Sequence, residues 1–216
     1  FINIFVKLVE KIVPQKSSEQ EEKHRLTYID ERLLQTPAIA VGNTKNELIK
    51  MAQIAKENLE LSTAMLFDEN FDETALIKDN EKALNTLNKC ITEYLTKLMG
   101  KDITTEDEKK VGSYYHVVMD IERVGDYAEN IMEYALKLRS EVISLSDSAF
   151  EELKDMTNKV YDLFDVSIKV FDERNPALLE QVDYIEESVD KASVDLEDMH
   201  IRRVQQGCCN AQAGSI

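Results

Sequence analysis

Apolar residues recur at alternating three- and four-residue steps along most of the chain, which is the spacing of helices with one buried face. The clearest stretch spans residues 111–135. Its apolar stripe consists of Val111, Tyr114, Val118, Ile121, Gly125, Ala128, Met132 and Ala135. A glycine in a helix interior costs roughly 1 kcal/mol relative to alanine, so a packing or functional reason is expected. We predict that another helix approaches closely at Gly125.

Four other segments show the same periodicity. We predict helices over residues 45–67, 73–99 and 105–139, a fourth from residue 148 through 171, and a fifth from residue 176 to about 206. Capping signatures stand at four of the starts: Thr44 with Glu47, Thr105 with Glu108, Ser148 with Glu151, and Asn175 before Pro176. Only six glycines and three prolines occur among 216 residues. The pattern and the composition together predict an all-α protein.

The first 43 residues do not continue this pattern. Residues 1–13 are apolar with charged interruptions, and they are too few to span a bilayer, which takes about 20 apolar residues. They fit the cytoplasmic end of a spanning helix, an interfacial segment or an amphipathic helix packed on the bundle. Residues 15–23 are polar and predict a linker. Residues 26–41 are broken by Pro37, which favours an extended or loosely helical strap.

The charge balance narrows the classes of partner. A formal net charge of −16 and the absence of a basic stripe argue against nucleic acid. The same charge favours cations as partners, and it disfavours direct capture of phosphate without a bridging metal. Cys90, Cys208 and Cys209 form neither a metal-binding pattern nor a disulfide framework, so we expect reduced thiols.

A row of carboxylates runs beside the apolar stripe of residues 111–135. Glu122, Asp126, Glu129 and Glu133 share one face of the helix, because residues three or four apart are neighbours on a helix. Spacing alone leaves two interpretations open. The row is either a solvated acidic face or a set of oxygen ligands for a hard metal ion, completed from a facing helix.

Catalytic patterns have less support in the sequence. His24, His116 and His200 occur singly, and none completes a Glu-x-x-His pair. There is no glycine-rich phosphate loop, nucleophile elbow or HExxH motif. We therefore expect that the chain is not an enzyme.

Two stretches resemble a known family. Residues 122–131, ERVGDYAENI, resemble the E-R-[IV]-G-D motif of the PhoU family, regulators of phosphate uptake built from two repeated three-helix bundles. Residues 28–37, YIDERLLQTP, resemble the linker between the membrane part and the PhoU-like tail of bacterial sodium/phosphate cotransporter-type proteins. The two matches together cover most of the chain after residue 26.

The resemblance implies a fold of repeated three-helix bundles. Residues 1–43 would be a membrane-proximal segment and linker, residues 44–141 the first repeat, and residues 146–216 a second repeat that stops before its last helix. A faint internal repeat agrees, since residues 47–51 resemble 152–156 and residues 67–70 resemble 171–175. That offset puts the counterpart of Glu122 about ten residues beyond Ile216. The remnant of the sixth helix would be residues 208–216.

The resemblance also implies a metal site. Glu122 and Asp126 correspond to the family's Glu-x-x-x-Asp pair, which would hold a divalent metal or an iron cluster with acidic residues of the preceding helix. The positions that we align opposite them are Asn88 and Thr92, and neither is a carboxylate. This departure from the family pattern weakens the prediction of a multinuclear cluster.

The function implied is regulation. The chain would be a cytoplasmic domain, on the inner side of the cell membrane, that senses or controls phosphate uptake by a sodium-dependent transporter. Its partner would be the membrane transport domain of the same polypeptide, with no small-molecule substrate bound directly. One alternative is a ligand-free helical dimerisation or scaffold module, in which a second copy covers an apolar groove along the fourth and fifth helices. Another is a free-standing metal enzyme.

Overall fold

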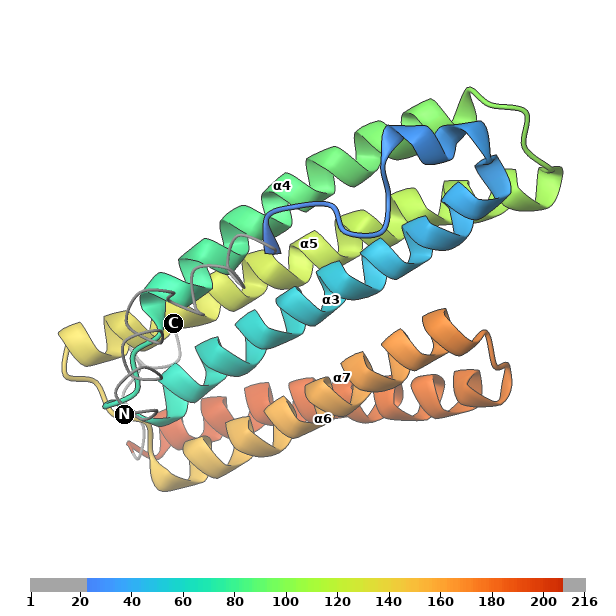
Figure 1. Cartoon of the computed structure of the whole chain (residues 1–216). Helices are drawn as coiled ribbons and strands as arrows, with labels where there is room; N and C mark the ends of the chain where they lie inside the picture. Colours follow the sequence, from blue (N-terminus) through green and yellow to red (C-terminus); the bar gives the residue numbers. More distant parts are fainter. Residues whose placement is uncertain (1–22, 208–216) are drawn as a thin grey trace, which may run out of the picture. The chain divides into compact units, whose positions relative to one another are not determined.

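The structure is a computed structural model, and it describes residues 23–207. In that range it contains a short 3₁₀ helix and five α-helices, with no strand (Figure 1). In chain order these are η1 (Glu31–Gln35), α3 (Pro37–Phe67), α4 (Thr74–Met99), α5 (Thr105–Ser140), α6 (Asp147–Glu173) and α7 (Ala177–Gln205). The predicted all-α fold class is confirmed. The predictions for residues 1–22 and for residues 208–216 lie outside the described residues.

The chain divides into two compact units. Unit 1 comprises Phe1–Ala55 and Lys78–Gly125, and unit 2 comprises Lys56–Ile77 and Asp126–Ile216, each as far as it is described. The helices α3, α4 and α5 contribute residues to both units, whereas α6 and α7 belong to unit 2 alone.

The start of α3 differs from the prediction. The helix begins at Pro37, eight residues before the predicted Lys45. Proline fits the first turn of a helix because the missing N–H has no intrahelical partner there. Thr44 lies inside the helix, where its hydroxyl donates to the carbonyl oxygen of Ala40 at 2.8 Å. The capping box assigned to Thr44 and Glu47 is therefore wrong, and the predicted strap ends at Thr36 instead of Val41.

The other helix starts lie within a few residues of their predicted positions. For α5 the cap is Thr104, whose hydroxyl accepts from the backbone N–H of Asp107 at 3.1 Å. For α6 it is Ser146, two residues before the predicted Ser148. The helix α7 begins at Ala177 with Pro176 as its N-cap residue, so the cap predicted at Asn175 is wrong by one residue. The side-chain oxygen of Asn175 still accepts from the backbone N–H of Ala177 at 3.1 Å.

Unit 1 has a tightly filled core. Five positions of the predicted α5 stripe, from Val111 to Gly125, belong to unit 1, and all five are buried. The other three, Ala128, Met132 and Ala135, are buried in unit 2. In unit 1, α4 contributes side chains with no exposed surface: Leu84, Leu87, Ile91, Leu95 and Leu98. Truncating such a leucine to alanine costs about 2–5 kcal/mol, because a cavity remains where the side chain was. Burial of these stripes is the main stabilising term of the unit.

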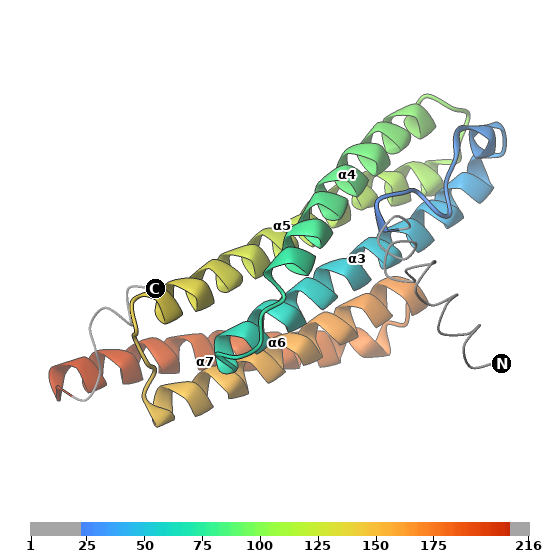
Figure 2. The same ribbon diagram turned by 60° about the vertical axis from the view of Figure 1, so that its left-hand side comes forward.

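In unit 2, the last two helices, α6 and α7, have few buried residues. The core of unit 2 holds Met65, Ile77, Met132 and Ala135. Figure 2 shows α6 and α7 side by side, and Arg203 of α7 joins them by donating to both carboxylate oxygens of Glu152 at 2.7 and 2.6 Å. On α6 only Ala149 and Val166 are buried, and no described residue of α7 is. The apolar stripes of this helix pair are thus only half-covered.

Candidate functional site

The acidic row predicted on α5 exists, but its members differ in exposure. Glu122 is half-buried and Asp126 is exposed, and the two lie one turn apart on the same continuous helix. Glu129 is half-buried and Glu133 is exposed. Glu122 and Glu129 are therefore the two less exposed members of the row.

Gly125 lies where α4 approaches α5. A Cβ atom built on this glycine would stand 2.5 Å from Cδ1 of Leu84 and 2.9 Å from Oε2 of Glu81. Gly125 itself is buried. The predicted close approach of another helix is confirmed, and the absence of a side chain at this position is what permits it.

Glu81 is the α4 carboxylate that faces this point. It is only 6% exposed, and Oε1 accepts a hydrogen bond from the side-chain amide of Asn85 at 2.9 Å. A carboxylate removed from water needs such polar partners. Glu81 of α4 thus lies against Gly125 of α5. Gly125 is within one helical turn of Glu122.

The alignment of Thr92 with Asp126 is wrong. The helices α4 and α5 are joined by a short loop and run antiparallel, so a forward step on α5 is a backward step on α4 (Figure 1). Gly125 contacts Leu84 and Glu81, which puts Thr92 about 12 Å further along α4 than Leu84. Thr92 instead donates its hydroxyl hydrogen to the side-chain oxygen of Asn88 at 3.3 Å. Within residues 23–207 no three acidic, histidine or cysteine side chains are grouped closely enough to hold a metal ion.

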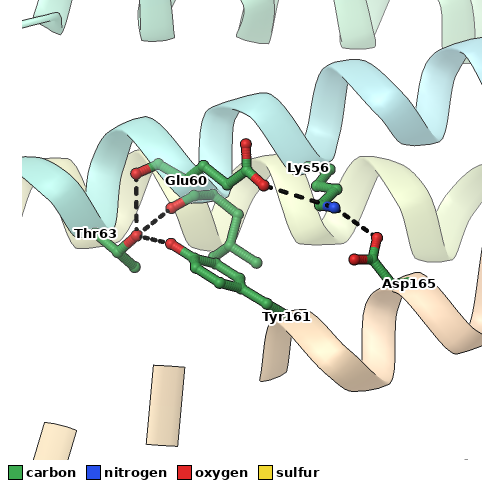
Figure 3. Close-up of polar contacts among 6 residues, drawn as sticks. Lys56, Glu60, Thr63, Tyr161 and Asp165 are labelled. Carbon is green, nitrogen blue, oxygen red and sulfur yellow. Dashed lines mark hydrogen bonds and ion pairs between the residues drawn. The ribbon is translucent and has the colours of Figure 1, made fainter. Parts of the chain in front are cut away.

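Unit 2 carries a polar contact between α3 and α6 that the sequence pattern did not indicate. The ammonium group of Lys56 lies 2.5 Å from Oδ1 of Asp165 and 3.6 Å from Oε1 of Glu60 (Figure 3). The hydrogen bond from Lys56 to Asp165 raises the pKa of the ammonium group. A raised lysine pKa means that the pair is fully formed at neutral pH and is lost only as the pH rises through that pKa.

Two turns further along α3 than Lys56, the hydroxyl group of Thr63 shares a hydrogen bond with the hydroxyl group of Tyr161 of α6 (Figure 3). Burial raises the pKa of Tyr161. Both residues line an apolar pocket of about 360 Å³, together with Leu59, Leu138 and Met156 among others. Most of the surface of this pocket is apolar.

A further polar contact closes the end of α3 in unit 2. The guanidinium group of Arg139, near the end of α5, donates to the backbone carbonyl oxygens of Met65, Asp68 and Phe71, the last two at 3.0 Å. The final carbonyls of a helix have no intrahelical donors, so this side chain satisfies acceptors that would otherwise need water.

Among residues 23–207, no histidine belongs to a group of three potential metal ligands. His116 is exposed on α5, as expected for a surface position. His24 lies with its Nε2 atom 3.3 Å from Oδ1 of Asp79 on α4.

In the part of the chain that the structure describes, no helix is long and apolar enough to span a membrane.

Comparison with known proteins finds a family that matches part of the chain. Residues 48–135 match the family described as the PhoU domain. This stretch runs from the middle of α3 to near the end of α5 and is less than half of the chain.

Two relatives are each named "Phosphate-specific transport system accessory protein PhoU homolog". The protein from Synechocystis sp. is 22% identical over 154 residues, which cover 71% of this chain and 67% of that protein. The protein from Aquifex aeolicus is 24% identical over 155 residues, covering 71% and 69%. A third relative, the "Putative inorganic phosphate export protein YjbB" of Salmonella typhimurium, is 21% identical over 168 residues, covering 77% of this chain and 30% of that protein. No solved structure matches the chain significantly.

The chain is thus an all-α, PhoU-like protein. The family match falls on α3, α4 and α5, and the last of these helices holds Gly125 and the acidic row.

Proposed function

We propose that this chain regulates phosphate transport. The observation that carries the proposal is the match of residues 48–135 to the PhoU domain, together with relatives whose names refer to phosphate transport. The described residues offer long packed helices and surface carboxylates, and a module of this kind acts by docking and by changes in helix packing.

The finer proposal is a cytoplasmic domain that acts on the membrane part of its own polypeptide, a sodium-dependent phosphate transporter. Two observations support it. Residues 28–37 resemble the linker of sodium/phosphate cotransporter-type proteins. The chain also matches only 30% of the length of YjbB, so in that relative the matching region is one part of a larger protein.

Cellular phosphate content provides the test. Cells that make this protein are compared with cells in which residues 44–205 are deleted in frame, each grown at low and at high external phosphate. We expect the deletion cells to lose control of total phosphate, so that their content follows the external concentration more steeply. A content that is unchanged at both concentrations would count against a regulatory role.

We also propose that Glu122 and Asp126 bind a divalent cation. Their donor set consists of carboxylate oxygens only, one half-buried and one exposed, which suits a hydrated Ca²⁺ or Mg²⁺. An iron cluster would need more protein ligands than this pair supplies. When bound, the cation would reduce the repulsion within the acidic row.

Calorimetric titration of Ca²⁺ and Mg²⁺ into the purified protein tests this cation site. We expect Glu122→Ala and Asp126→Ala each to weaken binding by about tenfold or more, because each removes one of two charged ligands. The matched control is Asp120→Ala on the same helix, where the carboxylate is exposed and lies 3.6 Å from Arg123. Equal affinities for all three variants and the unmodified protein would exclude the site.

A second candidate function is dimerisation. The half-covered stripes of α6 and α7 favour it, because α7 also exposes large apolar side chains such as Tyr184 (75% exposed) and Val194 (62% exposed). Light scattering on the purified chain separates a monomer from a dimer that covers this surface.

A further inference from the structure

The segment before α3 in the structure is residues 23–36, and from here on the name strap refers to this range instead of the predicted residues 26–41. The strap lies against α3 and α4 of unit 1 (Figures 1 and 2). The main contact is with Glu47 of α3. Its Oε2 atom accepts hydrogen bonds from the consecutive backbone N–H groups of Thr27 and Tyr28, at 2.8 and 2.7 Å. The Glu47 side chain has no exposed surface. This carboxylate therefore binds the main chain of the strap, independently of the strap's side chains.

Lys50, one turn along α3, completes the contact. Its ammonium group lies 3.5 Å from Oε1 of Glu47. It also donates to the carbonyl oxygen of Arg25 at 2.5 Å and to the hydroxyl of Thr27 at 2.7 Å. The two α3 side chains thus match the donors and acceptors of residues 25–28 in a complementary way.

The strap also contacts α4. Near its beginning, Lys23 donates to the side-chain oxygen of Asn80 at 3.1 Å, and His24 lies 3.3 Å from Asp79. At the other end, Glu31 pairs with Lys97. Between these points Ile29 and Leu34 are buried, at 4% and 7% exposed, and Leu26 and Leu33 are half-buried.

The helices alone do not account for Glu47. A buried carboxylate is costly unless polar groups surround it, and the hydrogen bonds it accepts here come from the strap. An apolar side chain would suffice at this position for helix packing. The strap, in turn, has only the five-residue η1 as regular structure. A segment with fewer buried apolar side chains than the core that it covers opens at a lower free energy than that core.

We propose that the strap is a releasable segment, held in place by Glu47 and Lys50, that opens as one unit while the helices of unit 1 stay folded. In the open state water solvates the carboxylate of Glu47 and the N–H groups of Thr27 and Tyr28, so both states satisfy their polar groups. This inference does not depend on the proposed role in phosphate transport.

Residue-resolved hydrogen exchange tests the proposal. We expect Glu47→Gln to speed exchange of the Thr27 and Tyr28 amides by about tenfold or more, because the charge that strengthens both hydrogen bonds is lost. Lys50→Met, which keeps an unbranched apolar stem, should speed the same amides. Amides of α3 and α4 should keep their rates in both variants.

The matched control is Glu60→Gln, which changes a carboxylate on the same helix that lies beside Lys56, away from the strap. We expect it to leave exchange in the strap unchanged. Faster exchange of the strap and of α3 together in Glu47→Gln and Lys50→Met would show that Glu47 belongs to the helix core and would overturn the proposal. Unchanged exchange in the strap would overturn it as well.

Discussion

Replacing Arg139 with methionine is expected to lower the free energy of unfolding by about 2–4 kcal/mol, because three backbone carbonyls lose a charged donor at once. These carbonyls, of Met65, Asp68 and Phe71, belong to the last turn of α3 and the loop that follows it. Methionine keeps the apolar stem of the side chain, so the loss reports on the guanidinium group.

Equilibrium denaturation by urea measures this effect. The control is Arg123→Met on the same helix, where the guanidinium is mostly exposed and lies 3.6 Å from the exposed Asp120. Exposed ion pairs contribute about 0–1 kcal/mol, so we expect a small change for this variant. Similar losses in the two variants would mean that Arg139 does not hold the end of α3.

The second large effect is expected at Gly125. Alanine there should cost about 1–3 kcal/mol, because the added methyl group would stand 2.5 Å from Cδ1 of Leu84, whose side chain has no exposed surface. The higher helix propensity of alanine, about 1 kcal/mol, offsets only part of that cost.

Gly112 offers a matched control on the same helix, since a Cβ atom there would meet nothing within 4 Å. We expect Gly112→Ala to raise the thermal midpoint, because only the propensity gain of up to about 1 kcal/mol applies. The two glycine variants should therefore change the melting temperature in opposite directions. A rise for both would show that α4 does not approach α5 as closely as the structure has it.

The helices were predictable because their signal is periodic and local. All eight apolar positions assigned to the stripe on α5 are buried, and the close approach at Gly125 follows from a glycine in the middle of that stripe. The acidic row was placed on one face for the same reason. Its role as a cation site remains a prediction.

The start of α3 was not predictable in the same way. A threonine followed three residues later by a glutamate is the pattern of a capping box, but Glu47 here bonds to Thr27 and Tyr28, about twenty residues earlier in the chain. Lys56 with Asp165 and Arg139 with Met65 are likewise contacts between distant positions. A single sequence shows no periodic pattern for pairs of distant residues, so these contacts can be found only from the structure.

The most direct test of the regulatory role is the initial rate of radiolabelled phosphate uptake after cells are moved from low to high phosphate. We expect cells with the intact protein to change this rate after the shift, and cells lacking residues 44–205 to keep their earlier rate. Equal rate changes in both strains would exclude a regulatory role of this chain.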